Sequence, residues 1–252
     1  MPQYLFATTF HKQGFTLYGK VMLESFLKNW SDDFSILVYT ENVNLPVHLI
    51  HPRIIVRDLH TSSSQLVEFK DRHAKNPPAH GFHPVDSLEK KWQFDAVRFS
   101  HKVFALYHAV KNPIEGTDII IWIDADTQTH TAVPTNFLDG VLAYKTWVNG
   151  EKNYIGINYL GREKQHTECG FVSYNLRHPL MQAFWDSFAT LYISDKIFDL
   201  REWHDSYVFD HVRKDFEQKG MINHNLSPVR SHHPFINTAL GDYMDHMKGN
   251  RK

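Results

Sequence analysis

The stretch that decides the fold is residues 118–126, which reads DIIIWIDAD. Its apolar core is uninterrupted and rich in β-branched isoleucine, a pattern typical of a central parallel strand that is buried on both faces. The run ends abruptly at two carboxylates, Asp124 and Asp126. Open α/β sheets bind their ligands beyond the carboxyl ends of their strands, so these two side chains are the first candidates for a functional site.

The N-terminal segment has the pattern of a β-α-β unit. Residues 4–9 (YLFATT) and 34–39 (FSILVY) are predicted strands. We expect Thr16 to cap the helix between them, with an apolar face made of Leu17, Val21, Met22 and Phe26. Such an opening favours a parallel sheet with a right-handed crossover.

Further elements follow along the chain. Residues 92–110 have a helical pattern, and residues 168–175 read as another strand. We expect Pro179 to open a helix, and a further helix from about Asp205 to Gln218. The tail after Gly220 is expected to be mostly irregular.

Length and composition favour one domain. The chain has 252 residues, 42% of them hydrophobic, without an internal repeat or a recognisable linker. We predict a single α/β domain over residues 1–252, with a mainly parallel central sheet flanked by helices. Residues 60–92 are polar and broken by prolines, so we expect a long excursion from the core that acts as a lid or as an acceptor-side loop.

Charge and cysteine content exclude several classes of function. The 27 basic and 28 acidic residues give a net charge of -1, so no electrostatic field is available to grip nucleic acid. The single cysteine, Cys169, excludes an intramolecular disulfide and is expected to be a small buried filler. Because neither a signal peptide nor a transmembrane segment is readable, we expect a cytoplasmic protein.

Asp124 and Asp126 have the chemistry of a metal site. Carboxylates are hard oxygen ligands suited to Mg2+ or Mn2+, and such an ion would neutralise a diphosphate group. The alternative is a polar turn after a strand, because aspartate is common in turns.

A second motif lies at the end of the chain, where residues 246–252 read HMKGNRK. Taken alone, it is a solvated basic tail. His-x-x-Gly-x-x-Lys downstream of an apolar strand that ends in Asp-x-Asp resembles glycosyltransferase family 8. That family contains glycogenin-like and bacterial lipopolysaccharide galactosyl- and glucosyltransferases with the GT-A fold, a Rossmann-like α/β architecture.

The resemblance implies a donor site and its cofactor. Asp124, Asp126 and His246 would bind Mn2+ (or Mg2+), with Gly249 and Lys252 on the donor diphosphate. Ala125, between the two aspartates, would also contact the donor. The implied reaction moves a hexose from a nucleotide-diphosphate sugar, UDP-sugar in this family, to a hydroxyl acceptor such as a glycan or lipopolysaccharide.

Weaker matches extend the donor site. Thr8, Thr9 and Phe10 follow the first strand, where this fold binds the nucleobase and ribose. Arg98 corresponds to an arginine that contacts the donor in that family. Lys102 lies one helical turn further and could also reach phosphate, although we favour a surface charge for it.

Two carboxylates are candidates for catalytic residues beside the sugar. Glu168 begins the segment ECGF, where the family usually has Asn-Ala-Gly, and Asp205 lies in WHDS, which resembles the family's segment beside the transferring sugar. If configuration inverts, one of them should act as general base on the acceptor. If it is retained, the leaving diphosphate can take that proton and the carboxylates position and stabilise charge.

Other classes of function remain as alternatives. A sugar nucleotidyltransferase would show a Gly-rich loop after the first strand, where only Gly14 is found. A non-catalytic nucleotide- or carbohydrate-binding protein on a related fold is the other alternative. A zinc site lacks the usual cysteine partners or the His-Glu-x-x-His helix, so we expect exposed loop histidines at four positions: His80, His83, His232 and His233.

Overall fold

The computed structural model describes residues 2–82, 92–227 and 233–247. Its centre is a seven-stranded sheet in the order β10-β8-β9-β4-β1-β2-β3. The strands are β1 (Tyr4–His11), β2 (Ser35–Glu41), β3 (Ile54–Asp58), β4 (Ile119–Ile123), β8 (Ile157–Leu160), β9 (Glu168–Asn175) and β10 (His224–Asn225). Only β9 runs antiparallel to its neighbours, β4 and β8. The remaining pairs are parallel, which confirms the predicted mainly parallel sheet.

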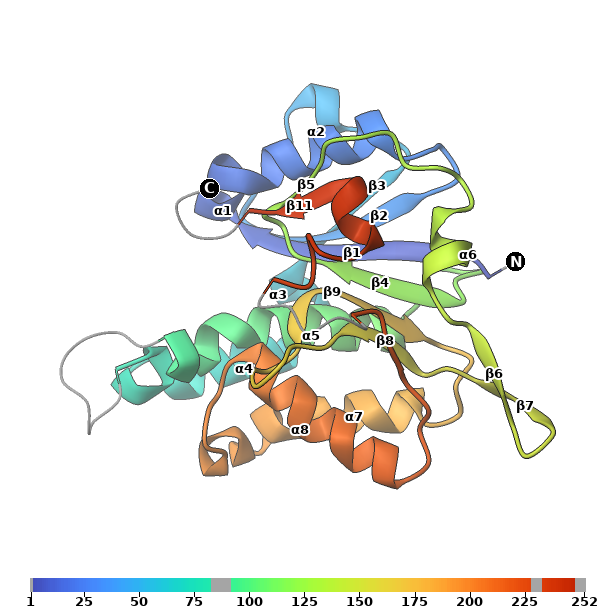
Figure 1. Cartoon of the computed structure of the whole chain (residues 1–252). Helices are drawn as coiled ribbons and strands as arrows, with labels where there is room; N and C mark the ends of the chain where they lie inside the picture. The colour runs from blue at the N-terminus through green and yellow to red at the C-terminus, as the bar shows by residue number, and fades with distance from the viewer. Residues whose placement is uncertain (1, 83–91, 228–232, 248–252) are drawn as a thin grey trace.

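Helices cover both faces of this sheet (Figure 1). One face carries α1 (Lys12–Gly14), the π-helix η1 (Phe15–Gly19), α2 (Lys20–Asn29) and α6 (Phe137–Val141). The other carries α3 (Leu59–Ser62), α4 (Ser64–His73), α5 (Ala96–Lys111), α7 (Met181–Ile193) and α8 (Asp205–Gln218). Single 3-10 turns complete the helical elements: η2 (Val47–Leu49), η3 (Pro77–His80), η4 (Trp92–Phe94), η5 (Lys196–Asp199) and η6 (Ala239–Asp242).

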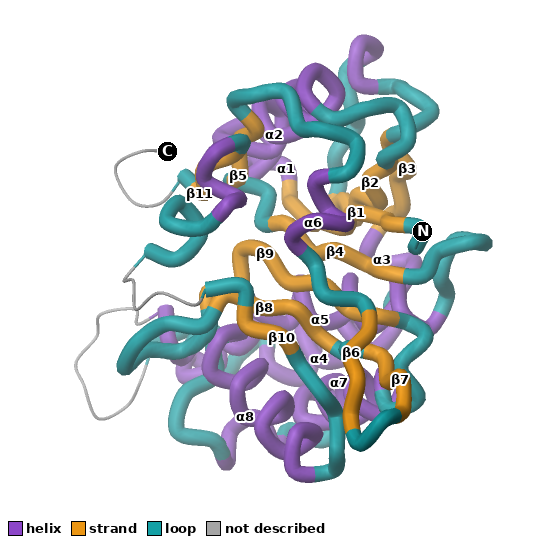
Figure 2. Tube along the Cα trace, turned by 45° about the vertical axis from the view of Figure 1, so that its right-hand side comes forward, coloured by secondary structure: helices purple, strands orange, loops and turns teal. Residues whose placement is uncertain are grey.

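Two small antiparallel pairs lie outside the central sheet. β5 (Thr127–Thr129) pairs with β11 (Met244–His246), and β6 (Lys145–Val148) forms a hairpin with β7 (Glu151–Tyr154). Figure 1 shows this hairpin projecting from the body of the domain, and in Figure 2 its two strands lie side by side. Within the described part of the chain, no helix has both the length and the apolar character needed to cross a membrane.

The sheet separates two apolar cores because successive side chains of a strand point to opposite faces. In β4, Ile120 and Trp122 belong to the core shared with α5 and α7, whereas Ile119, Ile121 and Ile123 belong to the core shared with α2. All five are at most 2% exposed. The prediction of a central strand that is buried on both faces is confirmed.

The first helical segment begins earlier than predicted and buries a different face. It begins at Lys12, where His11 Nδ1 accepts a hydrogen bond from the Gly14 backbone N–H, so Thr16 is not the cap. The wider π-turn of η1 then rotates the apolar face. Leu17 and Val21 are consequently 63% and 45% exposed, against the prediction, whereas the predicted burial of Met22 and Phe26 is confirmed.

The expectation of a long loop from residue 60 is wrong for residues 60–80. The segment forms α3, α4 and η3, and Leu66, Phe69 and Ala79 have no exposed surface. Only a few apolar residues stand among many polar ones in this segment. The sequence therefore does not show the regular spacing of apolar positions that would indicate a helix. Residues 83–91 lie outside the described part of the chain, and a role of this segment as a lid stays a prediction.

Smaller corrections concern the C-terminal half. The predicted helix over Asp205–Gln218 is confirmed, but the preceding helix begins at Met181 with Leu180 as its cap, so Pro179 does not open it. The tail after Gly220 is more ordered than expected, since it contributes β10, η6 and β11.

The phase of the first helix can be tested with a matched pair of leucines. Leu23→Ala should lower the free energy of unfolding by about 2–5 kcal/mol, because Leu23 is fully buried. Leu17→Ala should change it by less than about 0.5 kcal/mol, because that side chain is exposed. Urea denaturation of both variants measures the difference, and comparable losses would contradict the rotated helix face.

Candidate metal centre

The site is built on the turn that follows β4. The Asp124 backbone N–H donates to the Gly170 carbonyl of β9 at 3.0 Å, and the Thr127 N–H donates to the Asp124 carbonyl, also at 3.0 Å. These two bonds close a tight turn at residues 124–127. The carboxylates that end the buried strand therefore sit on a backbone that is fixed on both sides.

The C-terminal segment reaches this turn through the β5–β11 pair. Met244 pairs with Thr129 and His246 with Thr127, and the Met247 N–H donates to the Asp126 carbonyl at 2.9 Å. β5 is itself fastened to the helical layer, because the Thr129 carbonyl accepts from Asn29 Nδ2 at 2.6 Å. This pairing carries His246 to the end of β4.

Three candidate ligand atoms converge there. His246 Nε2 lies 2.9 Å from Asp126 Oδ1 and 3.5 Å from Asp124 Oδ2. Ligands at about 2.1 Å from an ion, at right angles to one another, are about 3.0 Å apart. The distances from His246 Nε2 to the two carboxylate oxygens are close to this value, all three atoms lie within 4.8 Å of one another, and they are donors that suit Mn2+ or Mg2+.

Asp124 is oriented by hydrogen bonds to its other oxygen. Oδ1 accepts from Trp122 Nε1 at 2.6 Å and from Lys102 Nζ at 3.1 Å. These two donors hold the carboxylate so that Oδ2 faces His246 Nε2. The atom left for a metal is thus selected by the surroundings of the aspartate.

His246 is oriented in the same way from its far side. Its Nδ1 lies 3.3 Å from Glu168 Oε1, which also accepts from the Gly170 N–H at 3.2 Å, while Glu168 Oε2 is paired with Arg162. The side chains of His246 and Glu168 are each 4% exposed. A buried carboxylate behind a histidine is the usual device that fixes ring orientation and tautomer in metal sites.

Glycine is required at position 170 by the closeness of His246. A Cβ built on Gly170 would lie 2.4 Å from His246 Nδ1 and 2.6 Å from Cε1. The histidine ring is buried and cannot move aside freely. The backbone of β9 and the imidazole therefore fit only in the absence of a side chain.

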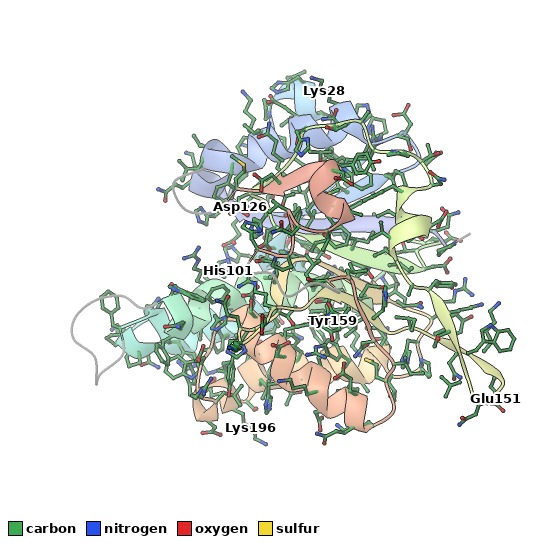
Figure 3. All side chains as sticks on the ribbon, viewed as in Figure 1. Lys28, His101, Asp126, Glu151, Tyr159 and Lys196 are labelled. Atoms are coloured by element: carbon green, nitrogen blue, oxygen red, sulfur yellow. The ribbon has the colours of Figure 1, made fainter. Side chains whose placement is uncertain are left out.

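A cavity of about 540 Å3 opens beside the candidate metal ligands Asp124 and Asp126. Figure 3 labels two of its lining residues, Asp126 and His101. Eight of the residues predicted for metal, donor or catalytic roles line it: Thr9, Phe10, Arg98, Lys102, Asp124, Ala125, Asp126 and Asp205. Thr8 is fully buried and Glu168 stands behind His246, so neither lines the wall. Gly249 and Lys252 lie outside the described residues.

Lys102 is a buried bridge and not the surface charge that the sequence favoured. Its side chain is 12% exposed, and Nζ donates to Asp205 Oδ2 at 2.8 Å and to the Cys169 carbonyl at 2.6 Å, besides its bond to Asp124. Burial opposes the ammonium form, but Asp124 and Asp205 outweigh that effect and raise the pKa of Lys102.

Asp205 is held at the opposite end of this bridge. Burial favours its neutral form, yet the Lys102 ammonium outweighs burial and lowers the pKa of Asp205 below its ordinary value. Asp205 is therefore a carboxylate at neutral pH. It lines the cavity and shares the ammonium group of Lys102 with Asp124.

Glu41 and His101 are among the residues of the cavity wall that sequence reasoning missed. Glu41 is buried and paired with His101 Nδ1. Burial acts to raise the pKa of Glu41, but His101 outweighs it and the pKa is lowered. The signal was present, because Glu41 ends a parallel strand beside the one that carries Thr9 and Phe10.

The predicted burial of the cysteine is confirmed, whereas the predicted exposure of the loop histidines is wrong where the structure describes them. Cys169 is buried as expected, and burial raises the pKa of its thiol. His80 is not an exposed loop residue: it is partly buried in η3, lines the cavity and contacts the His73 carbonyl at 2.9 Å. His233 is likewise only partly exposed, and His83 and His232 lie outside the described residues.

The fit between Gly170 and His246 generates a prediction. Gly170→Ala should displace the imidazole and weaken Mn2+ binding, because the added methyl group overlaps the ring. Gly140→Ala is the matched control, since a Cβ there meets nothing within 4 Å. Electron paramagnetic resonance of free Mn2+ reports the affinity of both variants. Equal affinity in Gly170→Ala and Gly140→Ala would contradict the placement of His246.

Comparison with known proteins identifies a solved structure with a similar fold. No family model matches the chain, and no curated protein matches it by sequence. Among solved structures, the apo form of mouse xyloside xylosyltransferase 1 matches with a TM-score of 0.53 and 12% sequence identity. The match covers 88% of this chain and 84% of that chain. The likeness confirms the predicted GT-A-like α/β fold.

Proposed function

We propose that this protein is a metal-dependent glycosyltransferase that moves a hexose from a nucleotide-diphosphate sugar, a UDP-sugar, to a hydroxyl acceptor such as a glycan or lipopolysaccharide. The observation that carries the proposal is the convergence of Asp124, Asp126 and His246, from two segments distant in sequence, at the edge of a cavity. A polar turn alone would not require a buried histidine to be positioned against both carboxylates.

The charge balance of the site supports a divalent cation. The group joined by the contacts described above contains four carboxylates (Asp124, Asp126, Glu168 and Asp205) and two cations (Lys102 and Arg162), which leaves an excess of two negative charges when His246 is neutral. Mn2+ (or Mg2+) held by Asp124, Asp126 and His246 would balance this excess and, when bound, stabilise the charge that develops on a departing diphosphate.

The cavity has the size and lining of a donor site. Its volume falls within the range of about 300–1,000 Å3 that is typical of small-molecule sites. Thr9 and Phe10, at the end of β1, offer a hydroxyl and an aromatic ring to a nucleoside. Arg98, in the first turn of α5, offers a guanidinium group that matches phosphate oxygens. Gly249 and Lys252 are proposed, from the motif, to complete the diphosphate contacts.

Asp205 is our candidate for the carboxylate beside the reacting sugar. It lines the cavity, is ionised, and is fixed relative to Asp124 by Lys102. In an inverting reaction it would accept the proton of the acceptor hydroxyl, and in a retaining reaction it would position and stabilise the sugar. Glu168 is better suited to orienting His246, because its carboxylate faces Nδ1 and not the cavity.

Two alternatives are separated by the products formed. A sugar nucleotidyltransferase would release pyrophosphate from a nucleoside triphosphate, and a binding protein would release no product. Mouse xyloside xylosyltransferase 1 is named for the transfer of xylose to a xyloside, which supports sugar transfer on this fold. The decisive support nevertheless comes from the metal ligands of this chain.

Binding of UDP tests the donor site. Calorimetric titration of UDP should show binding in the presence of Mn2+ and little in its absence. Asp126→Asn should weaken the Mn2+-dependent binding by more than roughly 100-fold, since losing a metal ligand costs more than the 10–100-fold lost with an outer-shell partner.

The control for this titration is Asp71→Asn, which removes an exposed carboxylate on α4 and should leave UDP binding unchanged. Failure of UDP to bind with Mn2+ present, followed by failure of other nucleoside diphosphates, would sink the transferase proposal. Metal-independent UDP binding would favour the non-catalytic alternative.

Asp205→Asn separates chemistry from donor binding. With the UDP-hexose that turns over, this variant should lower kcat by roughly 100-fold or more, while Mn2+-dependent UDP affinity is kept. Asp199→Asn, which removes an exposed carboxylate just before α8, is the control. UDP release in a coupled assay measures turnover. An unchanged kcat would remove Asp205 from the reaction.

A further inference from the structure

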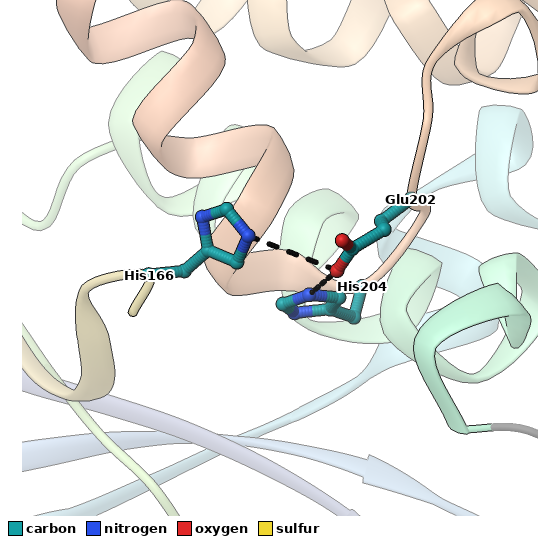
Figure 4. A group of neighbouring side chains, drawn as sticks. All are labelled: His166, Glu202 and His204. Atoms are coloured by element: carbon teal, nitrogen blue, oxygen red, sulfur yellow. Dashed lines mark hydrogen bonds and ion pairs between the residues drawn. The ribbon is translucent and has the colours of Figure 1, made fainter. Parts of the chain in front are cut away.

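A second cluster of metal-ligating side chains lies outside the cavity. His166 comes from the loop before β9, and Glu202 and His204 come from the loop before α8 (Figure 4). One donor atom from each residue lies within 4.8 Å of the others. The donor site described above uses none of these three side chains.

The distances within the cluster suit a tetrahedral ion. His204 Nε2 and His166 Nε2 lie 2.9 Å and 3.7 Å from the same oxygen, Glu202 Oε2. Tetrahedral ligands at about 2.0–2.1 Å from zinc are about 3.3 Å apart, which falls between these two separations. All three donor atoms lie within 4.8 Å of one another, so side-chain adjustments would bring both nitrogens and the oxygen onto one ion.

The environment of His166 points to a cation between it and Glu202. Its Nδ1 lies 3.5 Å from Asp210 Oδ2, and that carboxylate is fixed by the Thr167 N–H at 3.1 Å and by Arg213 at 3.2 Å. A neutral ring with its proton on Nδ1, toward Asp210, turns the Nε2 lone pair toward Glu202 Oε2. In that tautomer two acceptors face each other at 3.7 Å, a separation that leaves room for a metal ion or a second ring proton between them.

A metal ion bound by the cluster would account for the positions of all the side chains around it. Asp210 behind His166 forms the carboxylate–histidine pair that orients imidazole ligands. Glu202 Oε1 is occupied by Arg201 at 3.2 Å, which leaves Oε2 to face both rings. His204 is 2% exposed, so its imidazole is held in place by the surrounding protein.

We propose that His166, Glu202 and His204 form a second divalent-metal site of the class that takes Zn2+. Two imidazoles and one carboxylate make a donor set that suits Zn2+, whereas the carboxylate-rich first centre suits Mn2+ or Mg2+. The three protein ligands leave one tetrahedral position for water or another small ligand. The site does not depend on the proposed transferase function.

The site would fasten two segments that support the first centre. His204 directly precedes Asp205, which is bonded to Lys102, and His166 lies two residues before Glu168, which orients His246. An ion bound by both segments would fix the loop before β9 against the start of α8. We therefore expect its main effect to be on stability and on the positions of Asp205 and Glu168.

Zinc titration of the full chain tests this site. The background for the titration is the Asp124→Asn/Asp126→Asn double variant, in which the first centre is disabled. Bound metal is first removed with a chelator. Zn2+ is then titrated in competition with a chromophoric chelator. We expect one tight Zn2+ equivalent per chain. Co2+ in its place should give the intense visible absorption of tetrahedral coordination, and Zn2+ should raise the thermal unfolding midpoint.

Three further substitutions in this background give graded outcomes. His166→Gln and Glu202→Gln remove ligands and should weaken Zn2+ binding by more than roughly 100-fold, whereas Asp210→Asn removes an outer-shell partner and should cost roughly 10–100-fold. His211→Gln, an exposed histidine on α8, should leave the affinity unchanged. Because the His166 side chain is 30% exposed, that variant should fold even if Glu202→Gln does not.

The proposal is overturned if the double variant takes up no tight Zn2+, or if His166→Gln binds Zn2+ as tightly as His211→Gln. Either result would identify the cluster as a hydrogen-bonded ion network bridged by a proton. Because no nucleotide enters this experiment, its outcome is separate from that of the UDP titration.

Discussion

The candidate site depends on the antiparallel pairing of β11 with β5. Three residue pairs bring the C-terminal segment back across the end of β4, and the Met247 N–H fastens it to the Asp126 carbonyl. Without this pairing Asp124 and Asp126 would form only an acidic turn. With it, a buried imidazole is set against both carboxylates, and side-chain contacts from Trp122, Lys102 and Glu168 then orient these candidate ligands.

The second constraint is charge burial. Lys102 links Asp124 to Asp205, and Arg162 is paired with the carboxylate that orients His246. Taking such groups out of water is costly, and a well-packed apolar cluster would often be as stable. The arrangement is therefore best explained by what it positions. Asp124, for example, has one oxygen held by Lys102 and Trp122, so its second oxygen has a defined direction.

The local sequence was sufficient to predict the features that depend on the burial of a strand and on where that strand ends. The uninterrupted apolar run predicted a central strand, its end predicted two carboxylates at the edge of the sheet, and the α8 boundaries followed from the helical pattern. The convergence of His246 with Asp124 and Asp126 could be expected only through a family resemblance, because no local signal states that the tail returns to β4. The α/β class followed from the same strand and helix patterns.

Tertiary contacts decided the features that the sequence did not reveal. The burial of Lys102 depends on Asp205, about a hundred positions away in the chain, and the inward direction of Glu168 depends on His246 and Arg162. A single π-turn rotated the first helix, and no periodicity in residues 12–29 marks it. The cluster of His166, Glu202 and His204 was equally invisible, since two loops must meet to form it.

The most direct test of the central claim is a crystal of the protein soaked in Mn2+ and measured at the manganese absorption edge. We expect one anomalous difference peak bonded to Asp124 Oδ2, Asp126 and His246 Nε2, with Asp124 Oδ1 still held by Trp122 and Lys102. A peak elsewhere, or fully occupied Mn2+ with His246 turned away from it, would contradict the proposed metal centre. In that case the Asp-Ala-Asp segment would be a structural turn.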